Sequence, residues 1–187
     1  MTILKTLTAT VFAAGFASTT FAGGMTLETA TGPVTVDGVP KSIAVLDVAA
    51  IDTLDALGVE IAGIPAPHFA GYLDHVAANA TNVGSLFEPD FEALANLNPD
   101  IIVAGGRSSR QVEPLSEVAP TIDMTIWGDG HVEQVLARLD AFGTLTGTEA
   151  KAGELSEAFN AKLAQVSEAM AGKGNALVVL TNGPKVS

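Results

Sequence analysis

The stretch NPDIIVAGGRSSR, residues 98–110, decides the fold class of this 187-residue chain. Pro99 cannot continue a helix and biases Asn98 away from one, so the element before this stretch ends there. The run 101–104 is short, apolar and mostly β-branched, which is typical of a strand buried on both faces in a parallel sheet. The stretch therefore predicts an α/β fold built on a parallel sheet.

Two glycines and two arginines follow this predicted strand. Gly105 and Gly106 allow the backbone to turn where the strand ends, and Arg107 and Arg110 come directly after them. In open α/β sheets, ligands bind just beyond the carboxyl ends of the strands. Arg107 and Arg110 are therefore candidate ligand-binding residues, and their charge indicates an anionic ligand.

The first 22 residues have the pattern of a secretory signal peptide. Lys5 supplies the positive charge, residues 7–16 are short and largely apolar, and residues 20–22 have the small-x-small pattern of a cleavage site. The apolar run is too short to span a bilayer. The absence of cysteine excludes disulfides, thiolate metal sites and a lipid anchor on an N-terminal cysteine. We expect a soluble periplasmic protein that starts at Gly23.

Acidic residues outnumber basic residues in the expected mature chain. Without Lys5, eight lysines and arginines remain against 21 aspartates and glutamates. A surface this acidic repels nucleic acid and anionic lipid, so we expect neither nucleic-acid binding nor membrane insertion. An anionic ligand then needs a local basic patch, which strengthens the case for each arginine near a turn.

Hydrophobic periodicity predicts the elements before the opening stretch. We expect a hairpin or two edge strands, a buried strand, a helix, a second strand, a long loop and a short helix, in this order, at residues 25–36, 42–46, 50–57, 59–64, 65–84 and 91–97. Asp47 and Asp90 precede the two helices and are predicted N-caps.

The elements after the opening stretch are predicted in the same way. We expect a helix, a strand and a helix at residues 111–118, 121–126 and 131–142. A long helix capped by Thr148 then repeats apolar residues at helical spacing from Ala152 to Met170. Residues 175–181 are expected to form a new buried strand. Because such a strand needs neighbours on both edges, we expect the chain to be the front part of a longer protein.

The combined order of several short motifs resembles one protein family. The motifs are IAVLD (43–47), DTLDALGV (52–59), VGSLFEPDFE (83–92), NPDIIV with GR (98–103 and 106–107), APT (119–121) and VVLTNG (178–183). They resemble the N-terminal lobe of the helical-backbone periplasmic binding proteins, which serve ABC importers of ferric siderophores, haem and cobalamin. The resemblance is greatest to the branch that binds iron complexes of catecholate siderophores.

The resemblance implies two α/β lobes joined by one long helix, with the ligand in the cleft between them. On this basis the chain comprises a signal peptide at 1–22, an N-terminal ligand-binding lobe at 23–146, the linking helix at 147–173 and the first strand of a truncated C-terminal lobe at 174–187.

The resemblance also implies a ligand-binding role for Arg107, and the positions of Arg110 and Trp127 in the sequence make them further candidates. Arg107 matches the family's arginine at the end of the third strand, which contacts the anionic oxygens of the siderophore. A guanidinium suits a multiply charged ferric tris-catecholate, because it carries permanent charge and several donors in a fixed fork. The alternative is a turn arginine paired with a carboxylate. Arg110 is either a second ligand contact or a surface residue, and Trp127 either stacks on an aromatic ligand or packs in its turn.

Four residues of the predicted long loop raise the question of a metal site. They are His68, Tyr72, Asp74 and His75. No clear helix aligns the two histidines, and a metal cage needs three or four ligands. We therefore predict no metal site, and we place His68 and Tyr72 at the rim of the ligand cleft.

Glu92 is a candidate for contact with a partner protein. In relatives, a glutamate at this place on the outer surface of the lobe forms a docking salt bridge to an arginine of the permease. The alternative is an acidic residue that favours the first turn of a helix through the helix dipole.

The motifs of common enzyme classes are missing from the sequence. It has no Gly-x-Ser-x-Gly elbow, no His-Glu-x-x-His, no phosphate-binding glycine loop and no base near Ser108 or Ser109. We predict a monomeric, non-enzymatic binding protein without a cofactor, which captures a ferric siderophore for an inner-membrane ABC permease. The alternatives are a haem or corrinoid binder of the same fold and a non-functional or standalone periplasmic domain.

Overall fold

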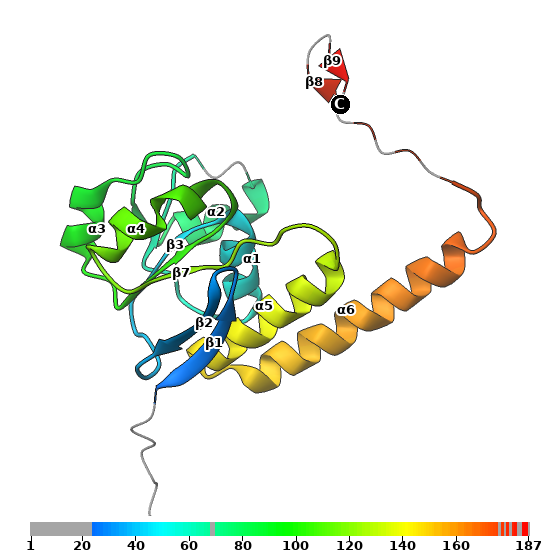
Figure 1. The fold of residues 1–187 in the computed structure, drawn as a ribbon, viewed down its shortest axis with the longest axis horizontal. Coiled ribbons are helices and arrows are strands. Elements are labelled where there is room, and N and C mark those ends of the chain that lie inside the picture. The colour runs from blue at the N-terminus through cyan, green and yellow to red at the C-terminus, as the bar shows by residue number, and fades with distance from the viewer. Residues whose placement is uncertain are drawn as a thin grey trace, which may run out of the picture.

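The computed structural model describes residues 24–67, 70–175, 177, 179, 181–182 and 185–186. Its body is a parallel sheet covered by helices on both faces (Figure 1). The strands, in their spatial order, are β5 (Thr81–Asn82), β4 (Gly63–Ile64), β3 (Ile43–Leu46), β6 (Ile101–Ala104) and β7 (Thr121–Asp123). The predicted α/β class with a parallel sheet is confirmed.

The two central strands carry the apolar runs seen in the sequence. β3 and β6 are buried along their whole length and pair in parallel, with Ile43 opposite Ile101 and Leu46 opposite Ala104. Successive side chains of a strand point to opposite faces, so each strand contributes to two separate apolar cores. These runs are continuous rather than alternating because both faces of the sheet are covered.

Helices cover the two faces in two groups. On one face lie α1 (Val48–Ala56), α5 (His131–Thr146) and the start of α6 (Glu149–Met170). On the other face lie α3 (Phe91–Leu97) and α4 (Val112–Ser116). None of the helices in the described part of the chain combines the length and apolarity that a bilayer crossing requires.

Several local predictions are confirmed. Residues 25–36 form an antiparallel hairpin, β1 (Met25–Thr29) and β2 (Gly32–Val36). Asp47 caps α1 by accepting a hydrogen bond from the Ala50 N–H at 2.9 Å, and Asp90 caps α3 by accepting one from the Ala93 N–H at 2.9 Å. Short polar side chains at these positions satisfy backbone donors that a helix leaves unpaired.

Two predicted strands are shorter than expected. The strand expected at 59–64 is reduced to β4, because the chain turns tightly after α1, where the Val59 N–H bonds to the Leu54 carbonyl. The strand expected at 121–126 ends at Asp123, whose carboxylate accepts hydrogen bonds from the backbone and hydroxyl of Thr125.

Three predicted helices also differ from expectation. The helix expected at 111–118 is α4, and a 3₁₀ helix, η2 (Gly106–Gln111), precedes it. α5 extends beyond the predicted 131–142 to Thr146. Thr148 precedes α6 but makes no capping hydrogen bond, because its hydroxyl pairs with that of Thr146 instead.

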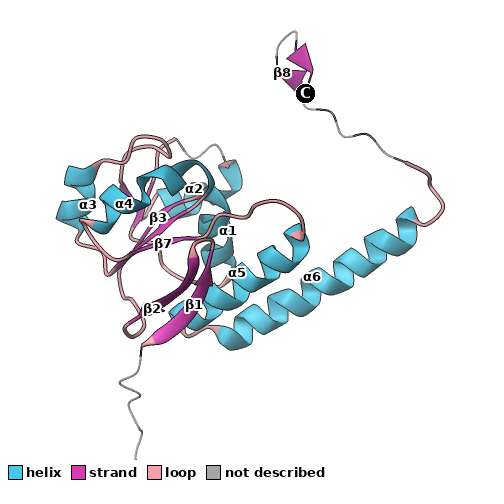
Figure 2. Cartoon of the chain, in the orientation of Figure 1, coloured by secondary structure: helices cyan, strands magenta, loops and turns pink. Residues whose placement is uncertain are grey.

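The first turns of α6 pack tightly against α5. Ala152 is buried, and a Cβ added at Gly143 of α5 would lie 2.7 Å from the Ala152 Cβ. Only glycine allows the two helices to approach this closely. The remainder of α6 continues past the end of α5 (Figure 2). The apolar stripe of α6 is partly exposed at Phe159, which still lines a pocket with Val135 of α5, and is exposed further along at Leu163, Val166 and Met170.

The buried strand expected at 175–181 is not found among the described residues. Leu177 is 87% exposed and Val179 is 48% exposed, and neither is in a strand. Ala176, Val178 and Leu180 lie outside the described residues. β8 (Thr181–Asn182) pairs instead with β9 (Lys185–Val186) in an antiparallel hairpin. An apolar run forms a buried strand only beside a sheet edge, and Leu177 and Val179, which are described, belong to no strand of the parallel sheet.

Candidate ligand-binding site

Three strands of the parallel sheet end around one cavity. Parallel strands bring their carboxyl ends to the same edge of a sheet, and β3, β6 and β7 are neighbours. The residues that follow them line a cavity of about 430 Å³. Its walls are formed by Asp47, Val48, Leu86, Gly106, Arg107, Thr125, Ile126 and Trp127. The structure therefore brings together two of the predicted ligand-binding residues, Arg107 and Trp127.

The turn from β6 into η2 is fixed by buried hydrogen bonds. The Ser108 hydroxyl is fully buried and donates to the Leu46 carbonyl at 2.7 Å, while it accepts from the Gly105 N–H at 3.0 Å. The Gly106 N–H donates to the Thr125 hydroxyl at 2.8 Å, and Gly106 has φ of +54°, in the left-handed region. Ser108 thus ties the ends of β3 and β6 together, which the sequence alone did not indicate.

Arg107 reaches the cavity without a carboxylate partner. Its side chain is exposed, and its guanidinium carbon lies 5.8 Å from the centroid of the Phe87 ring. In residues 24–67 and 70–175, the ion pairs within 4 Å join His75 to Asp55 and Lys151 to Glu154, and neither includes Arg107. The alternative of a turn arginine paired with a carboxylate is therefore not what the structure shows.

Asp47 places a carboxyl group in the wall of the same cavity. Burial raises the pKa of Asp47 above its ordinary value, the hydrogen bonds from the Ala50 and Ala49 N–H groups oppose this, and the charge of Asp123 adds to it. The positive charge of Arg107 acts in the opposite direction and lowers the pKa. Asp47 therefore both caps α1 and offsets part of the positive charge that Arg107 brings to the cavity.

Trp127 is held at the cavity by its backbone. Its side chain is 74% exposed. The Trp127 N–H donates to Oε1 of Gln134 at 3.1 Å, and Nε2 of Gln134 donates to the Trp127 carbonyl at 2.7 Å and to the Asp129 carbonyl at 2.9 Å. A single glutamine of α5 thus fixes the turn that carries the ring, and Trp127 does not pack in its turn.

Arg110 and Glu92 are also exposed. Arg110 belongs to η2, as Arg107 does, but it is not among the residues that line the cavity. Glu92 lies in the first turn of α3, where a negative charge is favourable. α3 covers the opposite face of the sheet from α5 and α6 (Figure 1).

Comparison with known proteins identifies the family. The model of a family described as periplasmic binding protein matches residues 43–186. The chain belongs to this family. It is a family of substrate-binding proteins rather than enzymes, in agreement with the prediction.

Individual relatives extend this comparison. The petrobactin-binding protein YclQ of Bacillus subtilis is 32% identical over 152 residues, which cover 79% of this chain and 48% of YclQ. The ferric-anguibactin-binding protein FatB of Vibrio anguillarum is 28% identical and covers the same shares of both chains. The solved structure of the catecholate-siderophore-binding protein VctP of Vibrio cholerae has a TM-score of 0.79 at 28% identity, over 87% of this chain and 60% of VctP. The chain thus spans about half the length of these curated relatives.

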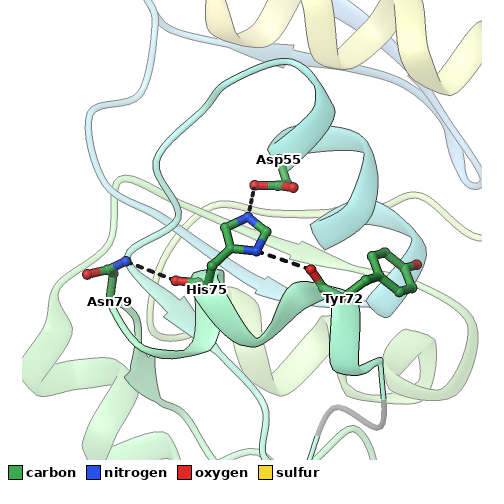
Figure 3. Close-up of polar contacts among 4 residues, drawn as sticks. All are labelled: Asp55, Tyr72, His75 and Asn79. Carbon is green, nitrogen blue, oxygen red and sulfur yellow. Dashed lines mark hydrogen bonds and ion pairs between the residues drawn. The ribbon is translucent and has the colours of Figure 1, made fainter.

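Tyr72, Asp74 and His75, the described residues among those considered for a metal site, are not among the residues that line this cavity. η1 (Gly71–Leu73) and α2 (Asp74–Ala77) shape the loop in which we expected no helix. His75 bonds through Nε2 to Oδ1 of Asp55 in α1 at 2.7 Å, and through Nδ1 to the Tyr72 carbonyl at 3.1 Å (Figure 3). The Asn79 side chain donates to the His75 carbonyl at 2.9 Å. The hydrogen bond to Asp55 is the main reason that the pKa of His75 is raised.

This histidine cluster provides no metal cage among the residues described. No group of three or more potential metal ligands occurs there. Tyr72 is exposed and does not line the cavity. The pKa of Tyr72 is raised mainly by the nearby charge of Asp52, with smaller contributions from partial desolvation and from a hydrogen bond to Asp52. His68 lies outside the described residues. The structure thus separates Tyr72 from Arg107 and Trp127, with which the sequence grouped it.

Proposed function

We propose that this chain is the N-terminal lobe and linking helix of a periplasmic solute-binding protein that captures an anionic ferric siderophore, of the catecholate type, and delivers it to an inner-membrane ABC permease. One observation carries the proposal: Arg107 and Trp127 line the same cavity at the carboxyl ends of the sheet strands. A permanent cation beside an aromatic face suits a chelate that is both negatively charged and aromatic.

The chemistry of the ligand explains why a positive charge and an aromatic ring are sufficient to bind it at this site. The iron is the cargo, and the oxygen atoms of the chelator bind it. The protein therefore needs donors for the anionic oxygens and a surface for the rings, rather than metal-ligating side chains. The names of the relatives support this ligand class. One relative is named as a binder of petrobactin, one of ferric anguibactin and one of catecholate siderophores.

Location and partner follow from other parts of the chain. The signal-peptide pattern of residues 1–22 and the absence of cysteine support export to the periplasm without a lipid anchor. Glu92 is exposed on α3, so it is accessible for docking to the permease. The body of the described chain then serves as one wall of the ligand cleft.

The single tryptophan of the chain gives a direct test, because Trp127 lies at the cavity. Ferric tris-catecholate is titrated into the chain while tryptophan fluorescence is measured, with the iron-free catecholate and hemin as controls. We expect saturable quenching by the ferric complex and little by the iron-free compound. No saturable quenching by the ferric complex, or instead a saturable shift of the hemin Soret band on addition of the protein, would contradict the proposal.

A further inference from the structure

Phe87 stands out because it is a large apolar side chain placed in the open. Its side chain is 62% exposed, whereas its neighbour Leu86 is buried and lines the cavity. We propose that Phe87 is a positioning residue, whose ring holds the Arg107 guanidinium at the cavity without neutralising its charge. This inference rests on the proposed function, in which Arg107 binds the anionic chelate.

The contact between the two side chains is of the cation–π type. The guanidinium carbon of Arg107 lies 5.8 Å from the centroid of the Phe87 ring, within the distance at which a ring face attracts a cation. A carboxylate would hold the arginine more strongly but would cancel the charge that the ligand needs. An aromatic ring restricts the side chain without adding a negative charge of its own, so less side-chain entropy is lost on binding.

The turn that carries Phe87 is itself rigidly built. The Ser85 hydroxyl accepts hydrogen bonds from the N–H groups of Phe87 at 3.3 Å and Glu88 at 3.0 Å. The Ser85 N–H donates to the Glu88 carbonyl at 2.9 Å, and Gly84 forms a bridge with Pro89. The ring is therefore presented by a closed turn rather than by a free loop.

A further hydrogen bond joins this turn to the helix that carries Arg107. Nε2 of Gln111, the last residue of η2, donates to the Phe87 carbonyl at 3.2 Å. Ring and guanidinium thus belong to two segments whose relative position is fixed by a contact that involves neither side chain. This arrangement is expected where an exposed pair must keep its geometry before the ligand arrives.

The contact is tested first without any ligand. In NMR spectra of the full chain, ring current from Phe87 should displace the Arg107 side-chain proton signals upfield. Phe87→Leu should remove this displacement and Phe87→Tyr should retain it. Phe91→Leu serves as the matched control, because Phe91 is also partly exposed and begins α3. Signals that are the same in the wild type and in Phe87→Leu would overturn the proposal whatever the ligand is.

The effect on binding is tested second, by calorimetric titration with ferric tris-catecholate. We expect Phe87→Leu to weaken the affinity about two- to fivefold, Phe87→Tyr to restore it and Phe91→Leu to leave it unchanged. Equal affinities of the wild type and Phe87→Leu would overturn the positioning role. If the wild type shows the ring-current displacement but binds no ferric chelate, the contact is upheld and the proposed function fails instead.

Discussion

Two surface clusters of this domain differ in whether their basic group is paired. The histidine cluster contains His75, Asp55 and Tyr72, and the arginine cluster contains Arg107 and Phe87. His75 is paired with the Asp55 carboxylate at 2.7 Å and with a backbone carbonyl, and the pair ties α2 to α1. Arg107 lies over a ring, faces a cavity of about 430 Å³ and takes part in no ion pair within the described residues. The basic group of the histidine cluster is paired with a carboxylate within the cluster. The guanidinium of Arg107 has no such partner in its cluster and is available to an anionic ligand.

The difference shows how a strongly acidic chain can present an anion site. The chain has 21 acidic residues, and a cation that is already paired with a carboxylate gains little from an anionic ligand. Arg107 is held apart by backbone contacts and by an aromatic ring. The following predictions test this contrast, beginning with the largest expected effect.

The turn that carries Phe87 should tolerate substitution of its glycine, Gly84, far less than the open turn at Gly128 does. Gly84 has φ of +94°, and a Cβ added there would lie 2.3 Å from the Asp90 backbone nitrogen. Gly84→Ala should therefore lower the free energy of unfolding by about 2 kcal/mol or more. Gly128→Ala is the control, because Gly128 has φ of +67° with open space around it, and it should lose only about 1 kcal/mol. Urea denaturation measures both, and equal losses would show that the turn is not tightly built.

Removal of the Trp127 ring should affect binding but not folding. Trp127→Ala should weaken the affinity for ferric tris-catecholate about three- to tenfold, because a stacking surface is lost. Its stability should hardly change, since the side chain is largely exposed. Tyr72→Ala is the matched aromatic control from the histidine cluster and should bind as the wild type does. Calorimetry reports both affinities, and a loss in Tyr72→Ala as large as that in Trp127→Ala would place the ligand elsewhere.

Neutralising Asp47 should strengthen anion binding. Asparagine can still cap α1, while the loss of a negative charge from the cavity wall should raise the affinity for the ferric chelate about two- to fivefold. The gain should shrink as salt is added.

Asp47→Asn should also be at least as stable as the wild type at neutral pH. Burial raises the pKa of Asp47 above its ordinary value of 3.8, so the folded state holds its proton more tightly. Stability contributed by this residue therefore falls as the pH rises through the raised pKa.

For the affinity prediction, an affinity of Asp47→Asn for the ferric chelate at low salt that equals the wild-type affinity would show that Asp47 does not influence the site.

The histidine cluster should give the smallest effect. The pKa of His75 is raised by its bond to Asp55, so the pair stabilises the fold fully below about pH 6.5 and loses this contribution as the pH rises through the raised pKa. NMR titration of the His75 imidazole should show a midpoint above 6.5, and Asp55→Asn should lower it. Chelate affinity should not change in His75→Gln, and a change would contradict the separation of the two clusters.

Local signals in the sequence predicted the parts of the fold that depend on few partners. The runs that became β3 and β6 are apolar and β-branched throughout, and Asp47 and Asp90 stand directly before helices. Arg107 and Trp127 were predicted to lie close together because strand ends in a parallel sheet share one edge, and both line the same cavity.

Contacts between segments distant in sequence could not be predicted in this way. Phe87 contacts Arg107, and the Ser108 hydroxyl donates to the Leu46 carbonyl, only because segments from different parts of the chain lie side by side. Within the segment 175–181, Leu177 is exposed although the run is apolar, because an apolar run is buried only where a partner is present. Periodicity reports the preference of a segment, and the neighbours of that segment decide the outcome.

The central claim is that Arg107 provides the charge that binds the ligand, and its neighbour in η2 offers the most direct comparison. Ferric tris-catecholate is titrated by calorimetry into the wild type, Arg107→Ala and Arg110→Ala. Both variants remove one positive charge from the same short helix, but only Arg107 lines the cavity. We predict that Arg107→Ala loses about tenfold or more in affinity and that Arg110→Ala stays within about twofold of the wild type. Equal affinities for Arg107→Ala and the wild type, or equal losses in the two variants, would contradict the account.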